Sequence, residues 1–454
     1  MSKEDKSYWL KSGSYSLLDR IFSVLLGLGN FALLTRNISK AEIGLWIQFL
    51  IVVAFIETGR SGLIQNGLLR YLNTSKKEDL GKINTASLTL SALLSLGSVV
   101  ILLILGPIFS EVYDFSDFVP MFYFYAITCF ITVSFYQFIF IQQANMDFRG
   151  IFWSNLINKG TLFLYILYFF INDNPINILH LSYVLALGAF LGSIIGYIFC
   201  KPYLNFERSV SKYWINELFK FGKFTLGTNL STMAYKFTDR TMLGTILNET
   251  AISIYEPAVR LTNLVDVPAF SIAAIVFPKS AQKSVNEATT PEEKKLISKE
   301  LYEKSVGAIL SLILPALVFF YIFADFAVVL LGGEAYADSA PILRLTIFFA
   351  LFMPFAYQFG TMLDSIGKPK VNFLFVIVGL ILNIILNFIF ISSFQIRGAV
   401  YGTLLTYFIM FVFQMIMLKK EFGVQFWKPI YYIPWFYKTM FTTGLEILKK
   451  LRTN

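Results

Sequence analysis

Apolar runs of about twenty residues recur along almost the whole chain, and residues 88–109 form one of them. A run of this length is what an α-helix needs to cross the hydrocarbon core of a bilayer. Of the 454 residues only 15% are charged, whereas soluble domains carry about a quarter. These features exclude a water-soluble enzyme, a disulfide-stapled secreted domain and a disordered chain. The sequence predicts an all-α polytopic membrane protein.

The hydropathy pattern predicts about twelve transmembrane helices. We expect them at residues 13–35, 43–66, 84–108, 118–141, 150–171, 177–200, 218–246, 253–277, 305–331, 341–363, 371–391 and 397–418. Most lysines and arginines lie in alternate loops, whereas the loops at 110–117 and 172–180 contain none. Because basic loops stay in the cytoplasm, both termini are predicted to be cytoplasmic. The net charge of +9 is therefore attributed to topology and not to nucleic-acid binding.

Two similar segments indicate an internal duplication. Ile38-Ser-Lys-Ala-Glu-Ile-Gly-Leu-Trp46 follows the first predicted span, and Leu247-Asn-Glu-Thr-Ala-Ile-Ser-Ile-Tyr255 follows the seventh. Two six-span repeats share one orientation, and such pairs of lobes around a central cleft are typical of transporters. We therefore predict four parts: an N-terminal six-helix lobe at 1–200, a cytoplasmic linker at 201–217, a C-terminal six-helix lobe at 218–418, and a basic, aromatic, interfacial cytoplasmic tail at 419–454.

Basic side chains also lie deep inside the predicted spans, where an arginine or lysine costs about 2.5–3.5 kcal/mol. Arg20 shares one helix face with the small or polar residues between Ser12 and Asn30, and Lys236 and Asp239 continue such a face from Gly222. Small residues alone would fit tight helix packing equally well. Because charged residues lie on the same faces, the pattern predicts that these helices form walls of a water-filled cleft.

Several motifs of the second half carry a family resemblance. They are Asp239-Arg-Thr-Met-Leu-Gly244 with Ile254-Tyr255, then Ile275-Val-Phe-Pro278, Gly367-Lys-Pro-Lys370, Leu382-Asn-Ile-Ile-Leu-Asn387 and Gly398-Ala-Val-Tyr-Gly-Thr403. In their order and spacing the chain, over about residues 8–420, resembles the polysaccharide transporter family. These are O-antigen type lipid-linked oligosaccharide flippases of the multidrug/oligosaccharidyl-lipid/polysaccharide superfamily. Glu57-Thr-Gly-Arg60 departs from the family, which often has an Asp-Leu-Gly-Leu-like sequence there.

The resemblance implies a flippase and not an enzyme. It would move an undecaprenyl-pyrophosphate-linked oligosaccharide from the inner to the outer leaflet of the bacterial cytoplasmic (inner) membrane by alternating access. The glycan would serve O-antigen (lipopolysaccharide), capsule or exopolysaccharide synthesis. The expected partners are this substrate, membrane lipids and a polysaccharide polymerase machinery, with no nucleic acid. A drug/cation antiporter of the multidrug and toxin extrusion type and a lipid II flippase stay open as alternatives.

Fixed positive charge suits a pyrophosphate, and amides suit a glycan. The candidate substrate-binding residues are Arg20, Arg60, Lys159, Lys236, Arg240, Arg260, Asn229 and Asn263. The candidate residues for ion pairs or ion coupling are Glu57, Asp239, Glu256 and Asp266. Asp239 is expected to pair with Lys236 or Arg240. Cys129 and Cys200 are interpreted as packing residues, and the sequence predicts no metal site, no cofactor and no nucleotide-binding loop.

Overall fold

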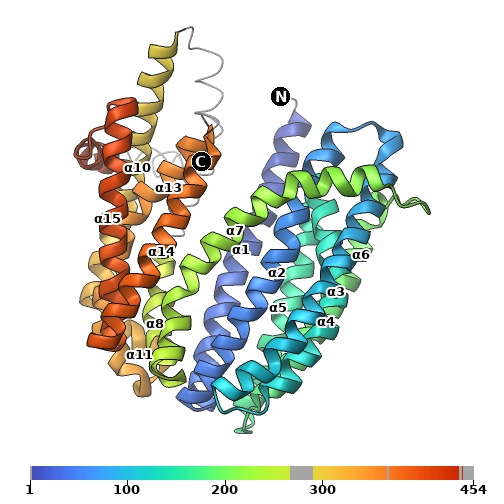
Figure 1. Cartoon of the computed structure of the whole chain (residues 1–454), viewed down its shortest axis with the longest axis horizontal. Helices are drawn as coiled ribbons and strands as arrows, with labels where there is room; N and C mark the ends of the chain where they lie inside the picture. Colours follow the sequence, from blue (N-terminus) through green and yellow to red (C-terminus); the bar gives the residue numbers. More distant parts are fainter. Residues whose placement is uncertain (1–2, 266–289, 366–367, 439–441, 443–454) are drawn as a thin grey trace, which may run out of the picture. The chain divides into compact units, whose positions relative to one another are not determined.

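The computed structural model describes residues 3–265, 290–365, 368–438 and 442 (Figure 1). Nearly all of them lie in helices, and these ranges contain no β-strand. The predicted all-α membrane fold is confirmed. Asp266, the second half of the span expected at 253–277 and the Ile275-Val-Phe-Pro278 motif lie outside the described residues, as does Gly367.

The helices follow one another with short connections. In chain order they are α1 (Lys3–Asn37), α2 (Lys40–Thr74), η1 (Lys77–Asp79), α3 (Leu80–Val112), α4 (Phe118–Ala144), α5 (Phe148–Ile171), α6 (Ile178–Cys200), η2 (Lys201–Tyr203), α7 (Lys212–Ile246), α8 (Glu249–Val265), α10 (Pro291–Ile322), α11 (Ala324–Gly332), η3 (Glu334–Ser339), α12 (Ala340–Thr346), α13 (Phe349–Ser365), α14 (Pro369–Phe394) and α15 (Ile396–Phe422). Within the described ranges, nine helices are long and apolar enough to cross a membrane. A tenth candidate is the pair Glu334–Thr346 and Phe349–Leu363, bent by 50°. Neither α7 nor α8 is among them.

By its contacts the chain divides into two compact units. Unit 1 comprises Met1–Phe237 and Asn248–Ser253, and unit 2 comprises Thr238–Leu247 and Ile254–Asn454. The division therefore falls inside α7 and again inside α8. The lobes at 1–200 and 218–418, with a linker between them, stay a prediction.

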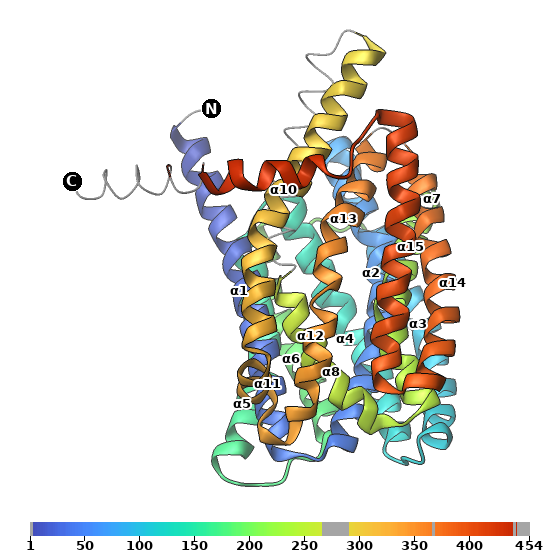
Figure 2. The ribbon, with the colours of Figure 1, turned by 90° about the vertical axis from the view of Figure 1, so that its left-hand side faces the viewer.

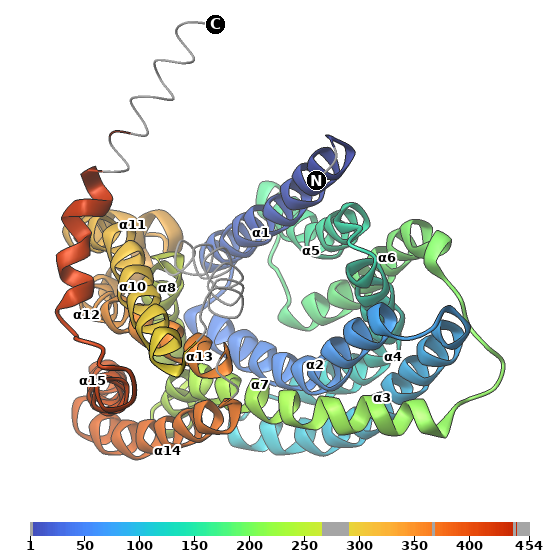
Figure 3. The same cartoon turned by 90° about the horizontal axis from the view of Figure 1, so that it is seen from above.

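In unit 1 the helices pack in a chain of neighbours: α1 against α5, α5 against α6, α6 against α4, and α4 against α3 and α2 (Figure 3). The first part of α7 packs closely on α2. A Cβ added to Gly222 would lie 1.7 Å from the carbonyl oxygen of Leu63. Leu218, one turn earlier, is fully buried in the same apolar cluster as Leu63. Glycine at 222 therefore permits a close backbone approach.

The segment that leads into α7 is fixed to the start of α3. The amide of Asn84 donates to the carbonyl oxygen of Asn205 over 3.0 Å. Thr85 and Glu207 exchange two hydrogen bonds, one from the threonine hydroxyl to the Glu207 carbonyl oxygen (2.9 Å) and one from the Glu207 amide to the hydroxyl (3.0 Å). These bonds satisfy backbone groups that an irregular connection would otherwise leave without partners.

The start of α10 is confirmed, but its extent differs from the expectation. Thr290 and Glu293 form a reciprocal capping box, which is the helix-start signal that Thr290-Pro-Glu-Glu293 predicts. In the basic segment 278–304 this signal predicts a short solvated helix. That expectation is wrong, because the helix continues to Ile322. A candidate membrane span does lie here, at Lys295–Ile322. The end expected at residue 331 is wrong, since α10 ends at Ile322 and a separate helix, α11, begins at Ala324.

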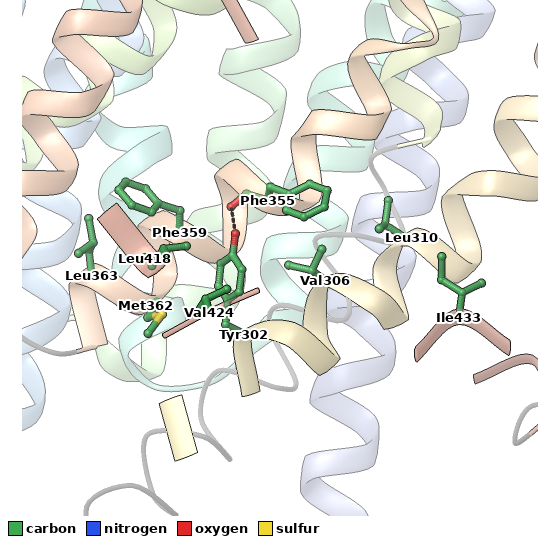
Figure 4. Packing of buried hydrophobic residues seen from close by; sticks show 10 residues of the cluster. All are labelled: Tyr302, Val306, Leu310, Phe355, Phe359, Met362, Leu363, Leu418, Val424 and Ile433. Atoms are coloured by element: carbon green, nitrogen blue, oxygen red, sulfur yellow. Dashed lines mark hydrogen bonds between the residues drawn. The ribbon is translucent and has the colours of Figure 1, made fainter. Parts of the chain in front are cut away.

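Unit 2 has its largest described core where α10, α13 and α15 meet. Helix α13 packs against both α10 and α15, and α14 lies against α15 (Figure 2). The hydroxyl of Tyr302 donates to the Phe355 carbonyl oxygen over 3.2 Å (Figure 4). The buried side chains of this cluster are Tyr302, Val306, Leu310, Phe355, Phe359, Met362, Leu363, Leu418, Val424 and Ile433. The last two come from the segment after α15, so the tail is part of this core.

Candidate functional site

In unit 1, the polar face of α1 meets α5. The ammonium of Lys159 donates to the Ser23 hydroxyl over 2.6 Å. One turn earlier on each helix, the Asn155 side chain hydrogen-bonds the Asp19 carboxylate. Arg20 is exposed on the same helix as Asp19. The structure therefore brings Lys159, predicted from a separate span, next to the polar face that the spacing on α1 predicts.

A buried ion pair joins Glu57 and Arg60, one turn apart on α2. The Arg60 Nη1 atom lies 3.0 Å from Glu57 Oε1, and only 5% of Arg60 is exposed. From α4, the Tyr125 hydroxyl donates to the same carboxylate oxygen over 2.9 Å. Arg60 donates to the Thr132 hydroxyl at 2.9 Å and to the Cys129 carbonyl oxygen at 2.7 Å. The pair therefore ties α2 to α4.

In unit 2, one buried carboxylate lies between two guanidinium groups. Glu256 Oε2 accepts a hydrogen bond from Arg240 Nε at 2.5 Å, and its other oxygen lies 2.8 Å from Arg260 Nε. The side chains of Arg240 and Glu256 are almost fully buried, whereas that of Arg260 is 26% exposed. This group, which we name the arginine triad, carries two positive charges and one negative charge. Its partly exposed member is the one able to meet a ligand.

Asp239 lies in a second buried network of unit 2. Its carboxylate accepts hydrogen bonds from the Tyr255 hydroxyl (2.6 Å), the Asn387 amide (2.6 Å) and the Thr403 hydroxyl (2.7 Å). Asn383 extends the network, because its amide donates to Thr403 and its oxygen accepts from Asn387. Three motifs of the family resemblance thus meet at one carboxylate. The expected partner Arg240 is instead bound to Glu256.

The remaining predicted residues lie on helix surfaces. Lys236 and Asn229 are exposed on the part of α7 that belongs to unit 1, and Asn263 is half-buried on α8 in unit 2. The Asn229 amide also lies against α2, since a Cβ added to Gly62 would be 2.9 Å from its Nδ2 atom. Asp266 lies outside the described residues.

Sequence reasoning did not find several partners of these charges. They are Tyr125 and Thr132 on α4, and Asn383, Asn387 and Thr403 on α14 and α15. One feature of the sequence could have revealed part of this network. Asn383 and Asn387 stand four residues apart in an otherwise apolar stretch of α14, residues 373–391, so both amides lie on one face and need a polar partner. Over the described residues, no group of three or more histidines, cysteines and carboxylates is placed to hold a metal ion.

Comparisons with known proteins place the chain among membrane proteins of glycan synthesis. The sequence profile of a family described as polysaccharide biosynthesis protein matches residues 33–341. An uncharacterized membrane protein of Methanocaldococcus jannaschii is 27% identical over 257 residues, which are 54% of this chain and 50% of that protein. A probable low-salt glycan biosynthesis flippase of Haloferax volcanii is 23% identical over 211 residues, 46% of this chain and 43% of that protein. The chain spans about half the length of these relatives.

Solved structures share the fold at low sequence identity. The lipid II flippase MurJ, in an inward closed conformation, has a TM-score of 0.74 at 13% identity, covering 96% of this chain and 99% of its own. An inward-facing multidrug resistance MATE family transporter has a TM-score of 0.71 at 16% identity, with 87% and 94% covered. A further transporter of the MOP superfamily, from Pyrococcus furiosus, has a TM-score of 0.66 at 16% identity, with 91% and 96% covered. With this fold, and with a profile match over more than half of its length, the chain belongs to the polysaccharide biosynthesis protein family.

Proposed function

We propose that this protein is a flippase that carries a lipid-linked oligosaccharide from the inner to the outer leaflet by alternating access, for the synthesis of a surface polysaccharide. Family membership and the relative named as a probable glycan biosynthesis flippase support this class. The family resemblance implied an undecaprenyl-pyrophosphate carrier in a bacterial inner membrane. Because the curated relatives reported above are archaeal, we define the carrier by its chemistry, as a polyprenyl chain ending in a phosphate or pyrophosphate.

The arginine triad is the observation that carries the proposal. A guanidinium group presents a planar fork of donors that matches phosphate oxygens. Glu256 holds Arg240 and Arg260 through one carboxylate, so the triad places two guanidinium groups side by side. Because Arg260 is the partly exposed member, we propose that it contacts the substrate phosphate and that Arg240 and Glu256 position it.

Arg20 and Lys159 are the corresponding candidates in unit 1. Both are exposed and lie beside hydrogen-bonding groups such as Ser23 and Asn155. Lys236 and Asn229 of α7, and Asn263 of α8, are proposed to contact phosphate or sugar. Arg60 is proposed to act through helix packing, because its guanidinium is buried against α4. Because placing a charged side chain inside a membrane is energetically unfavourable, such a residue is expected to have a function.

The drug/cation antiporter remains the second candidate, and the structural likeness to multidrug transporters shows only a common fold. A cation carrier would need exposed carboxylates. Here the carboxylates of Glu57, Asp239 and Glu256 are mostly buried, whereas Arg20 and Lys236 are exposed. This distribution favours an anionic substrate.

The test is glycan export by single alanine variants. Arg20→Ala and Arg260→Ala are each expected to abolish export while the protein still inserts into the membrane at the wild-type level. Arg36→Ala is the control, because Arg36 is exposed at the end of α1 and donates to the Ala32 carbonyl oxygen of its own helix over 2.6 Å. Wild-type export by both Arg20→Ala and Arg260→Ala would overturn the proposal.

A further inference from the structure

The chain after α15 turns back onto its own unit. Helix α15 ends at Phe422 and is capped by Gly423. The φ of Gly423, 71°, lies in the left-handed region, a conformation that glycine adopts without strain. Val424 follows and is buried in the core cluster with Tyr302. Residues 428–438 then form a helix that runs across α10 and not along it (Figure 2). We name this helix the tail helix.

One face of the tail helix and the turn before it are held by α10. The Gln425 amide donates to the buried Glu303 carboxylate over 2.9 Å. One turn further along α10, Gly307 leaves room for the tail helix, because an added Cβ would lie 2.7 Å from the Pro429 carbonyl oxygen. Ile433 completes the contact by entering the core cluster (Figure 4). Glu303 and Gly307 lie on the same face of α10, so the contact extends over a full turn.

The opposite face of the tail helix, together with Trp427 directly before it, is apolar and exposed. Tyr431 is 81% exposed, and Trp427, Ile430 and Trp435 are each at least half exposed. These residues lie beyond Phe422, where the last candidate membrane span ends. Large exposed apolar side chains directly after a span, with tryptophan and tyrosine among them, are typical of a helix at the membrane–water interface.

Lysines flank this aromatic face in the sequence. Lys419 and Lys420 lie in the last turn of α15, and Lys428 and Lys438 are the first and last residues of the tail helix as defined; all four are exposed. Glu421 is the acidic residue between them, and it is bound by Lys368. Lysines next to an anionic membrane surface strengthen binding to it through electrostatic attraction. The charge therefore selects an anionic lipid surface as the occupant of this face.

We infer that the tail helix binds the headgroup region of an anionic bilayer through Trp427, Tyr431 and Trp435, and that its opposite face fastens α10 to that surface. The tail helix is thus a two-sided clamp between lipid and α10. Binding of this kind is independent of the transported substrate, so it can be tested without a flipping assay.

The experiment uses the full-length protein reconstituted in vesicles, with Cys129 and Cys200, which are both buried and free, replaced by alanine. A polarity-sensitive fluorophore is attached at Tyr431→Cys and, as the control, at Glu292→Cys on the exposed first turn of α10. Brominated lipids are expected to quench the Tyr431→Cys label and to leave the Glu292→Cys label unquenched. Phosphatidylglycerol vesicles should give stronger quenching than pure phosphatidylcholine vesicles.

Two variants separate the two sides of the clamp. Lys428→Gln with Lys438→Gln should weaken the preference for phosphatidylglycerol while the protein stays folded, since both lysines are exposed. Gly307→Val should displace the tail helix from α10 and change the emission of the Tyr431→Cys label in both lipids. A Tyr431→Cys label that stays in water in both vesicle types would overturn the inference. So would quenching that depends on the protein-to-lipid ratio, because that result would assign the face to a second copy of the chain.

Discussion

Asn387 on α14 donates a hydrogen bond to Asp239 on α7 over 2.6 Å, although 148 positions separate them in the sequence. Tyr255 and Thr403 bring α8 and α15 to the same carboxylate. The network therefore joins four helices of unit 2 through one buried charge. Such a carboxylate must accept several hydrogen bonds to offset its desolvation.

The network predicts the effect of losing one donor. Thr403→Val removes the hydroxyl that donates to Asp239 and is expected to lower the free energy of unfolding in detergent by about 1–3 kcal/mol. Thr245→Val is the matched control, because Thr245 is exposed and bonds only its own helix in the contacts described. The control should stay within about 0.5 kcal/mol of wild type. Equal losses at both positions would argue against a structural role for the network.

The arginine triad predicts two different phenotypes for its two arginines. Arg260→Ala leaves Glu256 paired with Arg240, so the protein should fold and lose export. Arg240→Ala removes the fully buried partner and is expected to cost about 3–5 kcal/mol of stability. Thermal unfolding in detergent, measured beside export, separates the two. If Arg260→Ala were as unstable as Arg240→Ala, a substrate role for Arg260 would lose its support.

The pair Glu57 and Arg60 predicts a rescue. Glu57→Gln leaves a buried guanidinium without its carboxylate and should cost about 3–5 kcal/mol, whereas Glu57→Leu combined with Arg60→Met should recover most of that loss. Asp79→Asn is the control, since Asp79 and Lys82 form an ion pair of the same spacing that is far more exposed. Its effect should be at most about 1 kcal/mol. A double variant as unstable as Glu57→Gln would show that the charges themselves are required.

Cysteine labelling checks the two polar helix faces. Cysteines at Ser23 and Thr232, half-buried and exposed respectively, should react with a membrane-impermeant thiol reagent in at least one transport state. A cysteine at Ser87 is the control, because Ser87 is fully buried and bonded to Gln137. Cysteines that do not react at either Ser23 or Thr232 would indicate that these faces serve helix–helix packing instead.

The membrane potential is expected to drive the flip. Moving one charge across 100 mV changes the free energy by about 2.3 kcal/mol, so about two phosphate charges moving outward gain about 4.6 kcal/mol. Flipping in proteoliposomes should therefore accelerate under an outside-positive potential without any ion gradient. Asp239→Asn should slow flipping in all conditions, since it disturbs the network around Asn387. Acceleration by a proton or Na⁺ gradient, with none by potential, would reject this prediction.

Helical spacing predicts which residues share a face, but not which neighbour covers it. On α7, Gly222 and Lys236 lie on one predicted stripe, yet Gly222 is pressed against the Leu63 backbone while Lys236 is exposed. The packing interpretation therefore holds where Gly222 meets α2, and the cleft interpretation stays a prediction for the part of the stripe that contains Lys236. A pattern along one helix contains no information about the helix packed against it.

The partners of the charges were harder to predict than the charges. Arg240 and Asp239 are adjacent, so they point in different directions from the helix axis. Their partners Glu256 and Tyr255 are adjacent as well, on α8. The register between α7 and α8 decides this pairing, and the register depends on side-chain packing that no spacing rule contains.

The position of α7 bears on how the two repeats arose and on what would happen if the gene were divided between them. The predicted duplication assigns this helix to the start of the second repeat, yet its residues up to Phe237 belong to unit 1, with Gly222 against Leu63. If the repeats descend from one ancestral six-helix protein, the first helix of the second repeat now packs with the first repeat, as in domain swapping. A gene split between the repeats would thus encode two polypeptides, and the first would complete unit 1 only by binding α7 of the second.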